Sequence, residues 1–534
     1  MTLLRSNAAG RVLSASALSL ALVVGASVAS AEVVFHRGNT GEPETLDPHR
    51  TSTTYESNIL HDLLEGLVIH DPAANVVPGV AESWEISEDG KIYTFHLRGN
   101  AKWSNGDPVT AGDFVFSLRR ILTPDTGAKY SNILYPIKSA EAINNGEASP
   151  EDLGVVAIDD TTLQIELESA TPYFLELLTH QTGLPVHPPS VEAWGDDFVR
   201  PENMVTNGAY ILDEVVPQAH VKAVRNENYW ENDSVQVDTI FYYATEDRAA
   251  ALRRFQAGEL HTNNDVPQDQ VRWMKENLAE EFKASPRLGT YYYALNMKDA
   301  ALADARVRRA LSMAIDREYI VEEITGAGQM PAYSFVPPGT GNYGEPALAD
   351  YRELSMIDRE EQAIELLTEA GYGPDNPLEV EIRYNTSENH KQVALAIADM
   401  WAPLGVEVKL FNSDVATHYA YLRDGGEFQV ARAGWIADYN DAQNLLFLVE
   451  SDSVGFNYAK YDNPEYDALM DKAATTIDLE DRAKILRQAE EHFMRDLPFI
   501  PIYHYVNLEL VSSDVSGWEQ NVQGVHLTKY VRLK

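Results

Sequence analysis

Two arginines and an aspartate lie close together in one stretch of the sequence, where they could bind a ligand that carries both charges. Arg423 and Arg432 precede Asp438 within sixteen residues, with Gly434 and Trp435 in between. From Val430 onwards the stretch is otherwise apolar enough to be partly buried, and buried charges need partners. Asp438 could hold an ammonium group while either arginine holds a carboxylate, so the pattern suits a zwitterion. An internal ion pair between arginine and aspartate explains these residues at least as well.

Motifs of nucleotide binding, catalysis and metal binding are weak or missing. A Gly-x-Gly-x-x-Gly pattern occurs at Gly339, Gly341 and Gly344, but prolines flank it, and neither the strand nor the helix of a nucleotide site is indicated. The pattern therefore predicts a surface loop. Gly-x-Ser-x-Gly, His-Glu-x-x-His and calcium-loop motifs do not occur in the sequence. His180 and His187 lie around a bend, a spacing more typical of structural histidines, so we expect no metal and no cofactor.

Composition sets the class of protein. The chain has 534 residues, of which 44% are hydrophobic, so it can build large cores, and at this length two or three lobes are expected. The formal net charge of −40 repels phosphate backbones, which excludes nucleic acid as a main partner. Cysteine is absent, so thiol catalysis, thiolate metal sites and disulfides are excluded together.

The N-terminus predicts export. Arg5 and Arg11 precede an uncharged apolar stretch that ends in small residues at 29–31, as in a cleavable signal sequence. The apolar part is shorter than a membrane span requires, and no cysteine follows for a lipid anchor. We expect residues 1–31 to be a signal peptide, and the mature chain to be a soluble protein without membrane insertion in the periplasm of a Gram-negative cell.

Periodicity predicts that strands and helices alternate. Alternating apolar residues indicate strands at 91–97, 162–168, 378–384 and 406–411, whereas apolar residues three and four apart indicate helices at 306–324, 360–370 and 391–404. This alternation favours mixed α/β lobes. Two runs of adjacent aromatic residues, 290–293 and 503–505, must place side chains on both faces of a strand, and we interpret them as crossings between lobes.

A series of blocks along the whole mature chain resembles the solute-binding proteins of ABC importers, in particular the oligopeptide-binding class. The longest block is the segment 81–114. The block 430–440 contains Arg432 and Asp438, two of the three charged residues discussed above. Further blocks occur in family order at 46–49, 205–210, 228–230, 330–333, 384–390 and 505–507.

The resemblance implies an α/β fold of the periplasmic binding protein type (type II, cluster C), with two lobes around a cleft and an inserted extra domain. Domain I would comprise 32–64, 190–288 and 506–534, the inserted domain II 65–189, and domain III 289–505. The aromatic runs then fall at the two crossings, and closure around them would bury the ligand.

The resemblance also implies a binding site. Asp438 would bind the α-ammonium group of a peptide, and the backbone at Gly434 and Ile436 would pair with the peptide as a strand. The resemblance assigns the other residues to the lining of the site (Trp435, Tyr130, Tyr505), to the carboxylate end of the peptide (Arg432, Arg423, His390), to side-chain pockets (Asn385, Asn264, His180) and to pairing from the opposite side (Ser52, Thr53, Thr54).

The chain departs from the family pattern at several positions. Ser52 replaces an acidic residue, Ala416 a pocket tryptophan, and Thr325 a lysine used for longer peptides. Relatives also carry two cysteines at the positions of Gly289 and Ile436, so a family disulfide is missing here. These departures affect pocket shape and the preferred peptide length.

The expected function is that of a monomeric, non-enzymatic receptor that captures short peptides of about two to five residues and delivers them to a membrane permease. A murein peptide or another amine-bearing solute is the alternative within the same family. A periplasmic peptide hydrolase or chaperone is the alternative from another class; a hydrolase would need an activated nucleophile or a metal.

Overall fold

The structure, a computed structural model, describes residues 32–453 and 455–534. Residues 33–534 form one compact unit. The expected signal peptide, residues 1–31, lies outside the described residues. Within the described part of the chain, no helix is long and apolar enough to cross a lipid bilayer.

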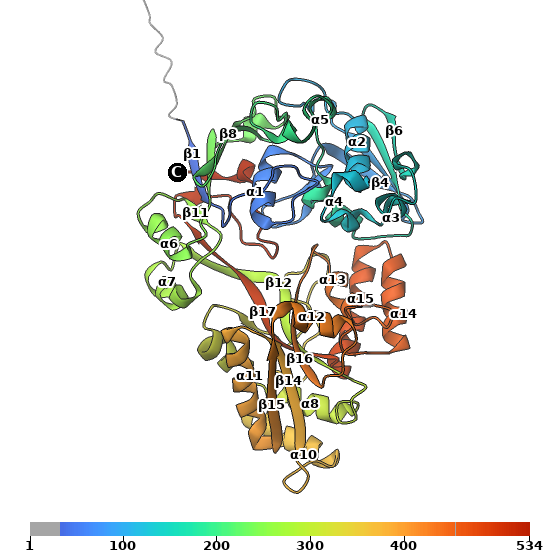
Figure 1. Cartoon of the computed structure of the whole chain (residues 1–534), viewed down its shortest axis with the longest axis vertical. Helices are drawn as coiled ribbons and strands as arrows, with labels where there is room; N and C mark the ends of the chain where they lie inside the picture. The colour runs from blue at the N-terminus through green and yellow to red at the C-terminus, as the bar shows by residue number, and fades with distance from the viewer. Residues whose placement is uncertain (1–31, 454) are drawn as a thin grey trace, which may run out of the picture. The chain divides into compact units, whose positions relative to one another are not determined.

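The largest element is an eleven-stranded mixed sheet that combines strands from distant parts of the sequence (Figure 1). Its order is β15 (Val406–Ser413), β14 (Leu378–Asn385), β16 (Val430–Ile436), β12 (Phe282–Leu295), β17 (Phe499–Val511), β11 (Thr262–Asn263), β1 (Val34–Gly38), β10 (Thr239–Tyr243), β9 (His220–Arg225) and β8 (Tyr210–Val216), with β13 (Met330–Pro331) paired to β17.

Two long antiparallel strands, β12 and β17, join the two ends of this sheet and lie side by side in Figure 1. Their pairing runs from Phe282 opposite Leu510 to Ala294 opposite Phe499, with register shifts after Pro286 and after Tyr291. At one end β17 pairs with β11, and at the other end β12 pairs with β16. The sheet therefore narrows to two strands where residues 283–286 of β12 pair with residues 506–509 of β17, next to the predicted crossings at 290–293 and 503–505.

Smaller sheets complete the β-structure. An antiparallel four-stranded sheet has the order β4 (Ala81–Ile86), β5 (Ile92–Leu97), β7 (Thr162–Glu166) and β6 (Val155–Asp159), and two-stranded pairs form between β2 (Val68–His70) and β3 (Val76–Pro78) and between β18 (Val515–Ser516) and β19 (Arg532–Leu533).

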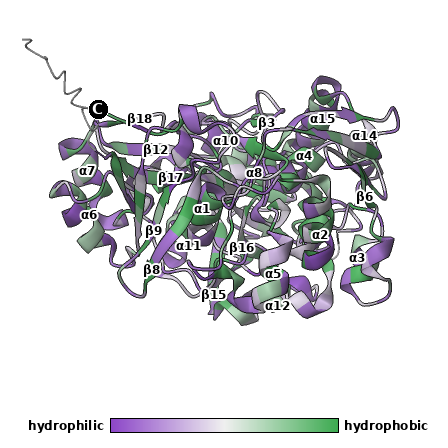
Figure 2. Cartoon of the chain, turned by 90° about the horizontal axis from the view of Figure 1, so that it is seen from above, coloured by the Kyte–Doolittle hydropathy of each residue, from purple (hydrophilic) through white to green (hydrophobic). Residues whose placement is uncertain are grey.

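The helices are amphipathic, and Figure 2 shows hydrophobic and hydrophilic residues on the same helix in α2 and α11. The helices are α1 (Thr54–Leu63), α2 (Ala111–Leu122), α3 (Ala140–Asn144), α4 (Phe174–Leu178), α5 (Pro188–Trp194), α6 (Arg248–Gln256), α7 (Val271–Asn277), α8 (Ala305–Met313), α9 (Arg317–Tyr319), α10 (Met356–Glu369), α11 (Glu388–Trp401), α12 (Val415–Arg423), α13 (Gln443–Leu446), α14 (Pro464–Thr475) and α15 (Leu479–Asp496).

Most predicted elements are present, but the prediction of one continuous helix at 306–324 is wrong. The structure ends α8 at Met313 and starts α9 at Arg317, because the Asp316 side chain accepts a hydrogen bond from the Tyr319 N–H and caps a new helix. A π-helical segment, Ile320–Thr325, follows. Asp316 therefore caps the start of a second helix, although the apolar periodicity continues through it and predicts one long helix.

The aromatic run at 290–293 lies in β12 and divides its side chains between two cores, as a strand requires. Tyr292 is buried in one apolar cluster with Phe335 and Phe499, whereas Tyr291 and Tyr293 are buried in another. The run therefore anchors β12 on both faces of the sheet.

Candidate functional site

The second half of β16 has a free edge. β16 pairs with β14 only at Val430 and Ala431, while its other edge pairs with β12 as far as Ile436. The Ala437 N–H donates to the Leu288 carbonyl of β12, so the polar backbone groups of Gly434 and Ile436 point the opposite way. Within the described chain no strand covers these groups, which leaves an edge that an extended peptide could extend.

Asp438 directly follows this free edge and has a carboxylate without a partner. In residues 32–453 and 455–534 this carboxylate makes no hydrogen bond and no ion pair. The side chain reaches solvent, yet the surrounding protein displaces enough water to raise the pKa of the Asp438 carboxyl above its usual value. A cation bound there would offset this desolvation.

Asn444 holds the backbone of this region in place. Its Oδ1 atom accepts hydrogen bonds from the indole Nε1 of Trp435 at 2.9 Å and from the backbone N–H of Asp438 at 3.0 Å. The ring of Trp435 also packs edge to face against Phe447 and Phe456. Trp435 and Asp438 are thus positioned by one buried amide, which the sequence prediction did not include.

Arg432 lies in a cage of tyrosines and an asparagine. Its Nη1 donates to Asn385 Oδ1 at 2.9 Å and to the Tyr419 hydroxyl at 3.0 Å, and its Nη2 donates to the Tyr505 hydroxyl at 3.2 Å. The guanidinium carbon lies 4.6 Å from the centre of the Tyr291 ring. An ion pair with Asp438, the alternative left open above, is not formed among the described residues.

His390 extends this cluster. Its Nδ1 lies 3.4 Å from the Tyr291 hydroxyl, and the two rings are 5.5 Å apart. Burial, with the positive charges of Arg432 and His418, lowers the pKa of His390 to about 3. His390 is therefore neutral at physiological pH and can offer a ligand a hydrogen bond but no charge.

Gly434 leaves room for the side chain of Tyr505, which reaches it from β17 across the intervening strand β12. A Cβ atom at this position would lie 2.5 Å from the Tyr505 hydroxyl. Since Tyr505 also contacts Arg432, the free edge adjoins the cluster around Arg432. The two parts together are called the surface around Asp438, which comprises Asn385, His390, Arg432, Gly434, Trp435, Ile436, Asp438 and Tyr505.

The remaining predicted residues, apart from Arg423, lie apart from this surface. Ser52 and Thr53 donate backbone N–H groups to Glu56 at the start of α1, where Thr53 is the N-cap and Thr54 the first helical residue. The Tyr130 ring lies 5.8 Å from the ring of His180.

Burial and the nearby His61 lower the pKa of His180 to about 3. Asn264 is half-buried, and its Oδ1 has no hydrogen-bond partner. In the described chain no hydrogen bond, ion pair or ring contact joins Ser52, Thr53, Thr54, Tyr130, His180 or Asn264 to the surface around Asp438.

Arg423 is placed elsewhere. It lies at the end of α12 and lines a separate hollow of about 430 Å³, together with Lys298, Lys460 and Tyr458. Its side chain is exposed and contacts none of the other predicted residues. The structure therefore separates the two arginines: Arg423 lies away from β16, whereas Arg432 lies on β16, the strand that leads to Asp438.

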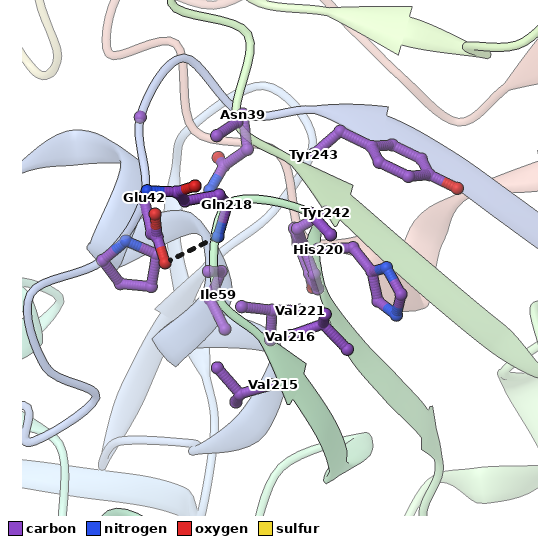
Figure 3. Close-up of a pocket in the computed structure, with 14 residues that line it drawn as sticks. Asn39, Glu42, Ile59, Val215, Val216, Gln218, His220, Val221, Tyr242 and Tyr243 are labelled. Carbon is purple, nitrogen blue, oxygen red and sulfur yellow. Dashed lines mark hydrogen bonds between the residues drawn. The ribbon is translucent and has the colours of Figure 1, made fainter.

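A small cavity between the start of the chain and strands β8, β9 and β10 is not a ligand site. Figure 3 shows its lining by Ile59, Val216 and Tyr242, with the backbone N–H of Gln218 donating to Glu42 at 3.1 Å. Its volume of about 30 Å³ suits a single water molecule. None of the predicted site residues lines it.

No group of three or more histidine, aspartate or glutamate residues in the described chain could hold a metal ion. Three residues of the site were missed by sequence reasoning: Tyr291, Tyr419 and Asn444. Asn444 lies only six residues after Asp438, but its role depends on the turn that α13 makes. Tyr291 and Tyr419 reach Arg432 through sheet pairing and helix packing, which no local pattern reveals.

Comparison with known proteins identifies the class that this fold and site define. The family model described as "Bacterial extracellular solute-binding proteins, family 5 Middle" matches residues 75–457. The chain belongs to this family, and its fold is the two-lobed α/β fold of periplasmic binding proteins.

Three relatives place the chain more closely. It is 38% identical to the periplasmic oligopeptide-binding protein OppA of Salmonella typhimurium, over 96% of each chain. Its structure matches the unliganded open form of the periplasmic murein tripeptide-binding protein MppA with a TM-score of 0.90, at 36% identity, over 94% of this chain and 98% of the other. The complex of Haemophilus influenzae OppA with the peptide RPPGFSPFR matches with a TM-score of 0.69, at 39% identity, over 94% and 99%.

The TM-score against the open form of MppA is thus higher than that against the peptide complex of OppA. The residues that the resemblance places on opposite sides of a ligand do not touch in this structure.

Proposed function

We propose that this protein is the periplasmic receptor of an ABC importer, which captures short peptides between its lobes and presents them to a membrane permease. The observation that carries the proposal is the free edge of β16 at Gly434 and Ile436, followed at once by the unpartnered carboxylate of Asp438. Backbone pairing and an ammonium contact are common to all peptides, so such a site tolerates many sequences. Relatives that bind oligopeptides or a murein tripeptide support this reading.

The rest of the proposal follows the predicted organisation. Residues 1–31 direct export, domains I to III have the boundaries given above, and β12 and β17 act as the hinge between them. Closure brings Ser52, Thr53, Thr54, Tyr130, His180 and Asn264 against the ligand, which then lies between them and β16. The receptor acts as a monomer without enzymatic activity, and labelled peptides incubated with it are expected to remain intact.

A murein peptide is the second candidate ligand, supported by the similarity to the open form of MppA. Both candidates offer an ammonium group and carboxylates.

Native mass spectrometry of the mature protein as purified, followed by release and identification of the bound molecules, tests the proposal. We expect a heterogeneous set of short peptides, whose masses give the length preference directly. A single murein-derived mass would identify a murein peptide as the substrate instead. An empty protein that no peptide mixture stabilises in thermal unfolding would contradict the proposal.

Peptide affinity is expected to fall at acidic pH. The ligand ammonium favours the charged form of Asp438, so binding lowers its raised pKa. The complex therefore holds fewer protons than free protein plus ligand, and affinity is lost as the pH falls through the pKa of the free protein. Calorimetry in buffers of different ionisation enthalpy should detect the released proton. An affinity that stays constant from pH 7 down to about pH 4 would contradict the role of Asp438.

A further inference from the structure

A second arginine near the candidate site, Arg287, has no partner among the residues that the structure describes. It lies in β12, inside the register shift between Pro286 and Thr290, and is half-buried. Its guanidinium makes no hydrogen bond, ion pair or ring contact with any residue that the structure describes. None of its nitrogens is among the side-chain atoms that are both sealed from solvent and unpartnered, so the charged end remains open to a ligand.

Arg287 lies near Tyr505, because the sheet pairs the neighbouring Pro286 with Val506 and Thr290 with His504. Burial lowers the pKa of Arg287, and the groups that act in the opposite direction are Tyr505 and Asp265. Tyr505 belongs to the surface around Asp438, where its hydroxyl contacts Arg432. Asp265 directly follows Asn264, whose Oδ1 is buried without a partner.

Asp265 does not neutralise Arg287. Its carboxylate pairs with Arg248 at 2.7 Å, and no ion pair within 4.0 Å joins it to Arg287. A half-buried cation without a counter-ion is unfavourable, because it loses water and gains no charge partner in return.

Two fully buried arginines of the described chain have firm partners, although the Nε of Arg482 has none. Arg317 donates to the carbonyls of Pro501, Ser312 and Ile315, and Arg482 forms a two-pronged ion pair with Asp441 at 2.6 and 2.9 Å. Arg287 differs from them in being half-buried, unpaired and close to residues of a binding surface. These features are typical of a residue whose partner arrives with the ligand.

We propose that Arg287 binds a carboxylate of the peptide and makes the receptor selective for peptides that present one at this position. The inference rests on the proposed function, and it adds a substrate class. The carboxylate belongs either to an acidic side chain or to the C-terminus of the peptide, and both have the same chemistry toward a guanidinium.

Calorimetry with matched peptides tests the proposal. Alanine tetrapeptides that carry one glutamate, or one glutamine, at each position in turn are titrated into the wild-type protein and into Arg287→Gln. The all-alanine peptide is titrated with a free and with an amidated C-terminus. Arg272→Gln serves as the control, because Arg272 is exposed on α7 and the substitution removes the same charge.

If an acidic side chain is the partner, one glutamate peptide should bind the wild-type protein at least about tenfold more tightly than its glutamine counterpart. If the C-terminus is the partner, amidation should cost the wild-type protein a similar factor. In either case Arg287→Gln should abolish the difference, whereas Arg272→Gln and Arg287→Lys should retain it.

Equal affinities for glutamate and glutamine peptides, together with an amidation effect unchanged in Arg287→Gln, would overturn the proposal while leaving peptide binding intact. A failure of every peptide to bind the wild-type protein would instead refute the proposed function itself. Circular dichroism melting of Arg287→Gln shows whether the variant is folded.

Discussion

Replacing Asp438 with asparagine is expected to weaken peptide binding by about 2–5 kcal/mol while leaving the fold intact. Asparagine keeps the shape of the side chain but removes the charge that would neutralise a buried ammonium group. The fold should tolerate the change, because the Asp438 carboxylate has no partner among the described residues and Asn444 holds the backbone through the Asp438 N–H. Calorimetry gives the affinity, and thermal unfolding checks the fold.

A control variant and a modified peptide show whether the loss of affinity comes from the charge of Asp438. Asp424→Asn removes an exposed carboxylate at the end of α12, away from Asp438, and should leave the affinity unchanged. Acetylating the peptide N-terminus removes the partner charge, so it should weaken wild-type binding strongly and Asp438→Asn binding only slightly. Independent, additive effects of the two changes would place the ammonium group away from Asp438.

The sequence was most informative about one short segment. The resemblance singled out Gly434, Trp435 and Asp438, of which the first two lie on β16 and Asp438 follows two residues after its end. The positions of the missing cysteines, Gly289 and Ile436, are direct register partners between β12 and β16. That pairing agrees with the resemblance.

Long-range contacts could not be predicted in the same way. Arg432 and Arg423 look equivalent in the sequence, and only the course of α12 separates them, because Tyr419 on that helix reaches Arg432 while Arg423 at its end points into another hollow. The zwitterion hypothesis therefore named both arginines, and only the structure separates their positions. The positions of the two arginines depend on contacts between residues that are far apart in the sequence.

The glycine-rich loop shows the same limit. As the sequence predicted, residues 337–350 contain no helix or strand, and Gly339 and Gly344 adopt the positive φ angles typical of turns. The sequence did not reveal that the buried side of this loop packs against α15. Tyr343 and Ala347 are buried there, and both donate hydrogen bonds to the side chain of Glu490 on α15.

Glu490 accepts four hydrogen bonds in a fully buried position. Its Oε1 accepts the backbone N–H groups of Phe335 at 3.0 Å and Val336 at 2.7 Å, and its Oε2 accepts the Tyr343 hydroxyl at 2.6 Å and the Ala347 N–H at 2.7 Å. Replacing it with alanine leaves four buried donors unpaired. Each unpaired donor costs about 1–3 kcal/mol, so we expect the free energy of unfolding to fall by at least about 4 kcal/mol.

Glu490→Gln should lose less than Glu490→Ala, because the amide oxygen can still accept from Phe335 and Val336 while the amide nitrogen faces the Ala347 N–H. The neighbouring Glu491 is exposed and makes only a surface ion pair with Arg487 at 3.5 Å, so Glu491→Ala should change stability by less than about 0.5 kcal/mol. Urea unfolding monitored by circular dichroism measures all three variants. A loss below about 1 kcal/mol in Glu490→Ala would mean that water enters and satisfies the loop, and that α15 does not hold it.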